Sequence, residues 1–201
     1  MFTGIVAALG SVRAAVPSGQ GSRVTIGAGG LGLADVQVGD SIAVDGCCLT
    51  VVELGADAFA VDVSRETLNC TAGFPVGRPV NVEKALRLAD RLGGHLVSGH
   101  VDGVGEVTRF EAAGESWLLE VRAPAPLAKY LARKGSVTIN GVSLTVNRAD
   151  GAQFAVNLIP HTLAVTNLKE LRAGSRVNLE VDLLARYVER LLEGTHGRPS
   201  E

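Results

Sequence analysis

The sequence predicts an all-β protein made of two related halves followed by a C-terminal α-helix. The segment Gly46-Cys47-Cys48-Leu49-Thr50 recurs as Gly141-Val142-Ser143-Leu144-Thr145, at an offset of about 95 residues, which is the length of a whole small domain. The 25 glycines and the scarcity of long helical patterns favour short strands joined by tight turns. Together these observations predict two small β domains in tandem.

Other segments repeat in nearly the same register. Arg65-Glu66-Thr67-Leu68 matches Pro160-His161-Thr162-Leu163, and Pro-Val-Asn-Val-Glu at 79–83 matches Arg-Val-Asn-Leu-Glu at 176–180. A chance similarity of five residues would not hold its register over so many segments. We therefore expect one domain at residues 1–94, a second at 95–182, a helix at 183–193 and a disordered tail at 194–201.

In the first half, strands are expected where β-branched residues alternate or cluster between turn signals. An opening strand interrupted by Gly4 and Gly10 is expected within 1–12, and the further strands are expected at 23–26, 41–44, 49–54, 59–63 and 79–82. Residues 27–36 predict a loop or a short helix. Apolar residues at helical spacing in 83–92, ended by two glycines, predict a helix after the last strand.

The second half repeats this plan and adds a helix. Strands are expected at 101–110, 117–121, 137–139, 144–146, 154–158 and 177–181, and a short helix at 126–133. A helix of about 11 residues is marginal alone, so the final one must pack on its own barrel or against other subunits, and the sequence leaves both open. Its apolar side chains lie three or four residues apart and form one stripe: Leu183, Leu184, Tyr187, Val188, Leu191 and Leu192.

Composition argues against several classes of partner. The formal net charge of -2 and the sequence pI near 6.1 give no basic field for nucleic acid or an anionic membrane surface. No apolar run reaches the roughly 18 residues that span a bilayer, and the N-terminus lacks the pattern of a secretory signal. The 3 cysteines are an odd set, and adjacent Cys47 and Cys48 are poorly placed to bridge each other. These features favour a cytoplasmic protein with small-molecule or protein partners.

The repeated motif separates two faces of a strand. Because successive side chains of a strand point to opposite faces, Cys47, Leu49 and Val51 should face the core while Cys48 and Thr50 face the other side. The copy in the second half places a serine and a threonine on that same side. Such polar pairs could simply be solvated, and a free cysteine is often only a small buried hydrophobe. The repetition of the chemistry favours a pair of similar sites.

A second motif, Gly-Gly-His-Leu-Val-Ser-Gly-His, occupies residues 93–100 where the halves join. Histidine is suited to proton transfer near neutral pH. His95 and His100 could ligate a metal, but no recognisable third ligand lies nearby, so a metal site is not expected. The glycines could equally belong to a linker. In the repeat register, however, Gly99 and His100 align with Gly4 and Ile5, so one half carries a histidine that the other lacks.

These segments resemble riboflavin synthase of the single-polypeptide α-chain type. The resemblance rests on four motifs in the same order, at residues 1–6, 45–50, 93–100 and 141–145 with 159–163, and it covers the chain up to the last helix. It implies two tandem six-stranded Greek-key β-barrels and a C-terminal helix that assembles three chains. It also implies an active site between the first barrel of one subunit and the second barrel of its neighbour.

The resemblance further implies a dismutation without cofactor or metal. Two molecules of 6,7-dimethyl-8-ribityllumazine react, and one gives a four-carbon unit to the other, which yields riboflavin and 5-amino-6-ribitylaminouracil. Two similar pockets suit two identical substrates held in opposed orientations, and such positioning can supply much of the acceleration. Association with lumazine synthase is left open.

The catalytic residues are expected where the halves differ, because the protein must decide which lumazine donates. Cys48 has Ser143 as its counterpart. We expect Cys48 and His100, with Ser41 and Asp182 in support, to shuttle protons or to stabilise a nucleophile added at C7 of the acceptor. A covalent thiol adduct is not required for this role.

The resemblance also implies substrate binding at the segments that match the family motifs. In the first half these are Gly4, Ile5, Val6, Cys48, Leu49, Thr50, Asp62, Val63, Ser64, Arg65, Glu66 and Thr67. In the second half they are Gly99, His100, Val101, Lys134, Ser143, Leu144, Thr145, Ile159, Pro160, His161, Thr162, Leu163 and Ala164. Asn140 and His161 stand where some members carry Asp and Glu, so no acid–base role is assigned to them.

Two alternative functions remain open. Non-catalytic lumazine- or flavin-binding proteins share this duplicated fold, but they tend to lose the paired Gly-His segment, and this chain has both His95 and His100. A purely structural trimer would not need the polar pairs at all.

Overall fold

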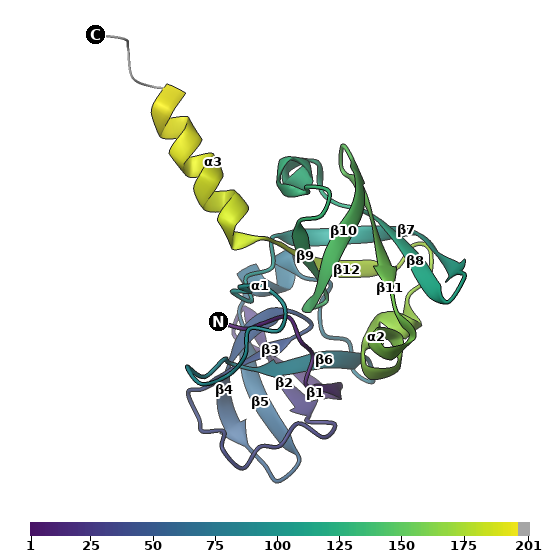
Figure 1. Cartoon of the computed structure of the whole chain (residues 1–201). Coiled ribbons are helices and arrows are strands. Elements are labelled where there is room, and N and C mark those ends of the chain that lie inside the picture. The colour runs from purple at the N-terminus through teal and green to yellow at the C-terminus, as the bar shows by residue number, and fades with distance from the viewer. Residues whose placement is uncertain (197–201) are drawn as a thin grey trace.

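Within residues 1–196, which the computed structural model describes, the strands close into two antiparallel β-barrels and a helix extends away from the second (Figure 1). The first barrel consists of β1 (Ala8–Ser18), β2 (Gly21–Gly27), β3 (Ser41–Val44), β4 (Cys47–Leu54), β5 (Ala58–Val63) and β6 (Pro79–Lys84). The second consists of β7 (Gly103–Ala113), β8 (Ser116–Arg122), β9 (Ser136–Ile139), β10 (Val142–Asp150), β11 (Gln153–Leu158) and β12 (Arg176–Val181). The helical segments are α1 (Arg65–Cys70), α2 (Pro160–Val165), α3 (Leu183–His196) and the 3₁₀ helices η1 (Ala125–Tyr130) and η2 (Asn167–Glu170).

Both barrels have the same strand order. The first runs β1-β2-β5-β4-β3-β6, and the second, read from β7, runs β7-β8-β11-β10-β9-β12. The pairing of β2 with β5, and of β8 with β11, passes over two intervening strands, which is a Greek-key connection. The predicted fold class, two six-stranded Greek-key barrels with a C-terminal helix, is confirmed.

Each barrel has its own core, formed by the inward faces of its strands. In β4, Cys47, Leu49 and Val51 are at most 5% exposed, whereas Cys48 is half-buried and Thr50 is exposed. Strand β10 shows a similar pattern, with the serine half-buried and the threonine exposed. The predicted separation of the motif into a core face and an outer face is therefore confirmed.

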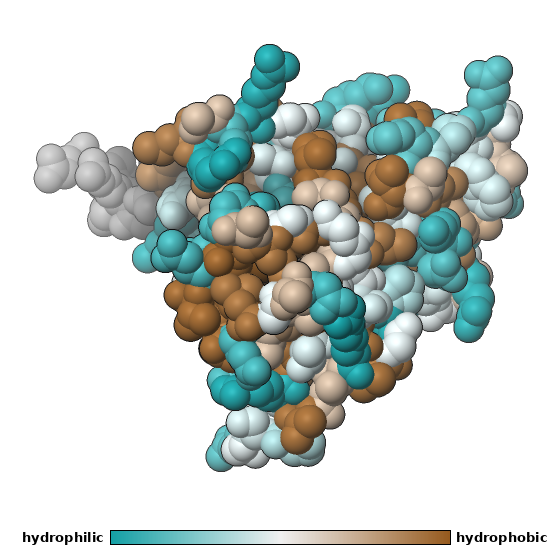
Figure 2. All heavy atoms as spheres, turned by 90° about the horizontal axis from the view of Figure 1, so that it is seen from below, coloured by the Kyte–Doolittle hydropathy of each residue, from teal (hydrophilic) through white to brown (hydrophobic). Residues whose placement is uncertain are grey.

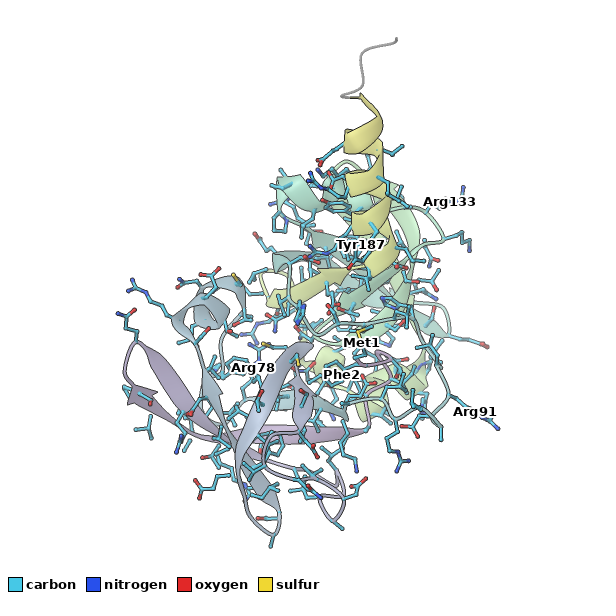
Figure 3. All side chains as sticks on the ribbon, turned by 90° about the vertical axis from the view of Figure 1, so that its left-hand side faces the viewer. Met1, Phe2, Arg78, Arg91, Arg133 and Tyr187 are labelled. Atoms are coloured by element: carbon cyan, nitrogen blue, oxygen red, sulfur yellow. The ribbon has the colours of Figure 1, made fainter. Side chains whose placement is uncertain are left out.

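Equivalent residues of the two halves meet where the barrels join. Phe2 and Val97 exchange two backbone hydrogen bonds, of 2.7 and 3.1 Å, and Figure 3 shows Phe2 between the barrels. The turns before β4 and β10 also touch, because a Cβ placed on Gly46 or Gly141 would lie 2.7 Å from the backbone nitrogen of the other. The repeat in sequence thus corresponds to repeated pairing in space.

A buried polar network crosses the same junction. Asn178 Nδ2 donates to the Asp45 carbonyl at 2.9 Å, and Asn81 makes the equivalent bond to the turn of the second barrel at 2.9 Å. The Asp45 carboxylate accepts from Asn81 N and Asn167 Nδ2, both at 2.8 Å, and lies 3.6 Å from Arg78. Burial raises the pKa of Asp45 to about 6, although Arg78 and the amide donors act in the opposite direction.

The predicted helix at 83–92 is wrong. Strand β6 continues to Lys84, and the amides of Ala85 and Leu86 then donate to carbonyls of two other segments, at 3.2 and 2.9 Å. Leu88 is fully exposed. Short helices gain little from their own hydrogen bonds, and here the backbone amides find partners outside any helix.

Other differences are local. Strand β1 begins at Ala8 rather than within the first residues, and residues 27–36 form a loop. The helix expected at 126–133 is the 3₁₀ helix η1. The short helices α1 and α2 follow β5 and β11, respectively, and were not predicted.

Helix α3 stands away from the barrels with its apolar stripe uncovered (Figure 1). Leu184, Tyr187 and Leu191 are 64%, 65% and 71% exposed. The helix contacts its own barrel through polar pairs, Arg186 with Asp102 and Glu189 with η1. It ends at His196, so the first part of the predicted tail is helical, and residues 197–201 lie outside the described part of the chain. None of the helices among the described residues is long and apolar enough to cross a membrane.

Candidate active site

The segment that opens the second half lies on the first barrel. Gly99 O accepts a 2.7 Å hydrogen bond from Cys48 N on β4, and Val101 packs against the core of the first barrel. Gly99 has a φ of +79°, and a Cβ there would lie 2.7 Å from Cys48 Cβ. Only glycine allows this approach. Residues 99–101, which stand in the second half of the sequence, therefore lie on the first barrel in the structure.

The segment that opens the chain makes the reciprocal contact. Gly4 O accepts a 2.8 Å hydrogen bond from Ser143 N on β10, and Val6 packs against the core of the second barrel. A Cβ on Gly4, whose φ is +75°, would lie 2.6 Å from Ser143 Cβ. Residues 4–6 thus belong to the second barrel, and we call 3–6 and 98–101 the exchanged segments.

The exchange brings Cys48 and His100 together in a pocket of about 210 Å³ on the first barrel. Helix α1 forms the opposite wall, and its N-cap is Ser64, whose Oγ accepts from Thr67 N at 3.1 Å. The pocket is lined by Cys47, Cys48, Glu66, Thr67, Cys70, Thr71, Gly99, His100 and Val101. Cys48 and His100, predicted as catalytic partners, therefore share one cavity.

The three thiols near this pocket are chemically different. Burial, followed by the neighbouring Cys48, raises the pKa of Cys47 to about 12, so Cys47 remains a thiol at neutral pH. A hydrogen bond to Glu66 raises the pKa of Cys70. Cys70 and Thr71 were not predicted as pocket residues, because helix α1 that carries Cys70 was not predicted.

The equivalent position on the second barrel holds a histidine–serine pair. A 2.7 Å hydrogen bond joins His95 Nδ1 to Ser143 Oγ, and the tautomer decides which atom donates. Burial lowers the pKa of His95, with Asp182 acting in the opposite direction. His95 Nε2 is buried and has no hydrogen-bond partner among the described residues. The sequence analysis singled out the motif that contains His95 as suited to proton transfer, but did not include His95 among the predicted catalytic residues.

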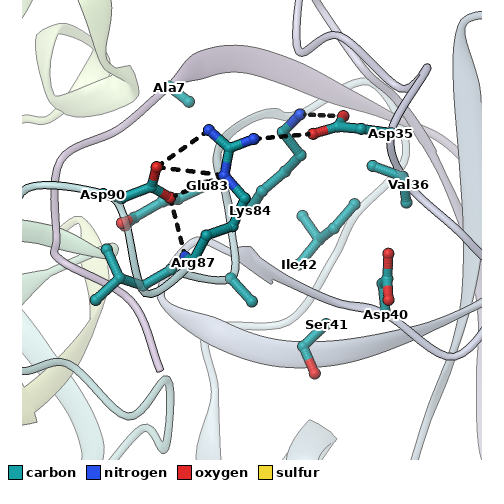
Figure 4. Close-up of a pocket in the computed structure, with 12 residues that line it drawn as sticks. Ala7, Asp35, Val36, Asp40, Ser41, Ile42, Glu83, Lys84, Arg87 and Asp90 are labelled. Carbon is teal, nitrogen blue, oxygen red and sulfur yellow. Dashed lines mark hydrogen bonds and ion pairs between the residues drawn. The ribbon is translucent and has the colours of Figure 1, made fainter.

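The two supporting residues lie on different barrels. Ser41 pairs with Thr50 across β3 and β4 and lines a separate pocket of about 380 Å³, beside the ion pairs of Arg87 and Lys84 (Figure 4). Asp182 follows β12 on the second barrel, where its charge acts on His95. Within one chain the four predicted catalytic residues thus lie in three places, and only Cys48 and His100 share a pocket.

Several predicted binding residues face away from the site. The side chains of Leu49 and Val63 lie in the core of the first barrel, and Leu144 and Leu163 pack against that of the second. Asp62 is held in a surface ion pair with Arg23, with two contacts of 2.8 Å. A matched strand segment contains inward residues at every second position, so some of its side chains lie in a barrel core.

The remaining predicted residues lie on the outer surface of the second barrel. Thr145 and Ile159 are exposed, and Lys134 has a φ of +69° with its amide donating to Val146 O at 2.7 Å. Helix α2 begins at Pro160. Among the described residues no group of three His, Cys, Asp or Glu side chains is arranged to hold a metal ion.

Comparison with known proteins agrees with this duplicated architecture. A family model described as "Lumazine binding domain" matches residues 3–85 and again 98–182. The riboflavin synthase of Photobacterium phosphoreum is 48% identical over 194 residues, which cover 96% of this chain and 89% of that protein. The riboflavin synthase of Mycobacterium tuberculosis (strain ATCC 25618 / H37Rv) is 45% identical over 199 residues, covering 96% of this chain and 98% of that protein.

Solved structures with the same fold contain a bound flavin or lumazine. LumP complexed with riboflavin superposes with a TM-score of 0.83 at 27% identity, covering 90% of this chain and 99% of LumP. LumP complexed with 6,7-dimethyl-8-(1'-D-ribityl) lumazine superposes with a TM-score of 0.81 at 27% identity over the same shares of the two chains. The identity to the riboflavin synthases is higher and extends over nearly the whole chain. With the lumazine-binding domain present twice and these relatives at 40 to 48% identity, the chain belongs to the riboflavin synthase family.

Proposed function

We propose that this protein converts two molecules of 6,7-dimethyl-8-ribityllumazine into riboflavin and 5-amino-6-ribitylaminouracil, by transfer of a four-carbon unit between them. The observation that carries the proposal is the 48% identity to a riboflavin synthase over 96% of the chain. The presence of one candidate site on each barrel supports it, because the reaction requires two bound copies of the same substrate.

The two sites offer different chemistry to identical ligands. The second barrel presents the His95–Ser143 pair, whose imidazole is neutral at pH 7 because burial lowers its pKa. The C7 methyl group of the lumazine is acidic because its carbanion delocalises into the ring. A neutral imidazole can accept this proton through the Ser143 hydroxyl. We therefore assign the proton-losing lumazine to the second barrel.

The first barrel then holds the other lumazine. Its pocket contains Cys48 and His100, and hydroxyls such as that of Thr67 suit a ribityl chain. In this proposal a nucleophile adds to C7 of the acceptor lumazine, and Cys48 and His100 stabilise that nucleophile. Asp182 supports the second site through its charge on His95, while Ser41 lies on the first barrel outside the Cys48 pocket.

We also propose that chains assemble as trimers through α3, so that the first barrel of one chain faces the second barrel of the next. The apolar stripe of α3 supports this, since an exposed stripe of this kind marks an interaction surface. A groove of about 640 Å³ lies between α3 and η1 and is lined by Tyr130, Val188 and Leu192. Figure 2 shows hydrophobic residues gathered on one part of the face seen from below.

A cytoplasmic location is consistent with three free cysteines.

The test is an assay with the purified chain and the lumazine. Riboflavin absorbance should appear, and its rate per chain should rise with protein concentration until the trimer is fully formed. The alternative function, a lumazine-binding protein, predicts quenched or shifted lumazine fluorescence with no riboflavin at any concentration. That outcome would exclude the proposed reaction.

A further inference from the structure

Two glutamates occupy equivalent positions on the last strands of the barrels, Glu83 on β6 and Glu180 on β12. Their side chains are 8% and 3% exposed. Burial raises the pKa of both carboxyls, and the hydrogen bonds that they accept act in the opposite direction. A buried carboxylate is costly unless its oxygens are satisfied, so their partners identify what they do.

Each glutamate binds one exchanged segment with the same three hydrogen bonds. Glu83 Oε1 accepts from Thr3 N and Thr3 Oγ1, both at 2.7 Å, and Oε2 accepts from Gly4 N at 3.1 Å. Glu180 Oε1 accepts from Ser98 N and Ser98 Oγ, both at 2.7 Å, and Oε2 accepts from Gly99 N at 3.0 Å. The bound turns are thus held by identical geometry in both halves.

The far side of each bound turn contacts the other barrel. Gly4, held by Glu83, accepts from Ser143 N of the second barrel at 2.8 Å. Gly99, held by Glu180, accepts from Cys48 N of the first barrel at 2.7 Å. Each glutamate is therefore connected through a single glycine to the site on the opposite barrel.

We propose that Glu83 and Glu180 are crossed positioning residues, each of which sets the site on the opposite barrel. Glu83 fixes the strand edge that carries Ser143, and Glu180 fixes the edge that carries Cys48. The consequence for the reaction rests on the proposed function, whereas the crossed coupling itself is a property of the free protein.

The substitution Glu→Gln tests this with little change in volume. A glutamine keeps one carbonyl oxygen, which can still accept both bonds from Thr3 or Ser98. Its amide group carries only donors, so it opposes the N–H of Gly4 or Gly99. The substitution therefore acts on Gly4 or Gly99, whose carbonyl accepts the hydrogen bond from the other barrel.

Glu120→Gln is a matched control. Glu120 is 8% exposed on β8 and accepts from Arg148 and Gln153 at 2.7 and 3.4 Å. Among the described residues, the donors to its carboxylate lie on β10 and β11 and not in either exchanged segment. Loss of a buried charge-assisted bond is thus common to all three variants, and contact with an exchanged segment is not.

The measurement is amide hydrogen exchange in the full-length protein, followed at Ser143 N–H and Cys48 N–H. Glu83→Gln should raise the exchange rate of Ser143 relative to Cys48 by about tenfold, and Glu180→Gln should lower that ratio by about tenfold. Glu120→Gln should leave it unchanged. The ratio is used because general destabilisation raises both rates alike.

An unchanged ratio in the two test variants, or a change confined to the barrel that carries the substitution, would overturn the proposal. A kinetic measurement connects it to the reaction. Both test variants should lower kcat about tenfold, whereas Glu120→Gln should leave kcat near that of the native chain. If the native chain makes no riboflavin, the proposed function fails while the exchange ratio still decides the crossed coupling.

Discussion

The buried carboxyl of Asp45 predicts a pH-dependent part of the stability that a single substitution removes. Its pKa is about 6 in the folded chain against an ordinary value of 3.8. The folded state thus binds the proton more tightly, so Asp45 stabilises the fold fully below about pH 3.8, and this contribution is lost as the pH rises through about 6. The complete loss is about 3 kcal/mol, and roughly half of it falls between pH 5 and pH 8.

Asp45→Asn isolates this contribution. Asparagine keeps an oxygen for the donors Asn81 N and Asn167 Nδ2, and it is the residue that the second half carries at the equivalent position, Asn140. Glu83 and the other buried carboxyl groups titrate in both proteins, so their contributions cancel in the comparison.

The assay is urea unfolding at pH 5 and pH 8, followed by Trp117 fluorescence at a fixed chain concentration. From pH 5 to pH 8 the native chain should lose about 1 to 2 kcal/mol more free energy of unfolding than Asp45→Asn. Asp150→Asn, the same change at an exposed position of β10, should behave like the native chain. Equal losses in the native chain and Asp45→Asn would refute the reasoning.

Three further substitutions test the site and the assembly. Gly99→Ala should reduce kcat at least about tenfold, because its Cβ would lie 2.7 Å from Cys48 Cβ. The control Gly73→Ala, at a similar φ of +77° with open space around it, should cost only about 1 kcal/mol of stability. Equal activities of the two variants would contradict the close approach. Cys48→Ala should abolish most turnover while lumazine still binds, as measured by fluorescence titration, and unchanged turnover with intact binding would exclude its catalytic role. Leu191→Glu should dissociate the assembly in light scattering and abolish activity, with Arg190→Gln as the control on the same helix; an intact trimer would show that the stripe is not the interface.

The fold could be predicted because its signals are local and occur twice. The alternation at Cys47 and Cys48 depends only on strand geometry, and the repeat fixes equivalent strands in both halves. The error at 83–92 has the opposite cause. That segment and α3 follow equivalent strands and have similar apolar spacing, yet only α3 is helical. Periodicity reports which residues could share a face, but not whether a surface exists to receive it.

The site could be predicted only in part, because its geometry depends on contacts between halves. Cys48 and His100 were identified as partners, but the sequence could not show that His100 crosses to the first barrel. The pairing of His95 with Ser143 was missed for the same reason, since no local pattern connects a glycine-rich turn to a strand of the other half. Glu83 and Glu180 stood in a recognised repeat, and their shared burial is visible only once the strands are in place.

The exchanged segments also constrain the order in which the chain can reach its native form during synthesis. Gly4 is translated well before its partner Ser143, which lies on β10 of the second barrel. The first barrel can close around its own core before that strand exists, but Phe2 must wait for Val97 and Gly4 must wait longer still. Such long-range closure is slow. Gly4 is therefore translated well before the strand that holds it in place, and Cys48 likewise lacks its covering segment until residues 98–101 have followed.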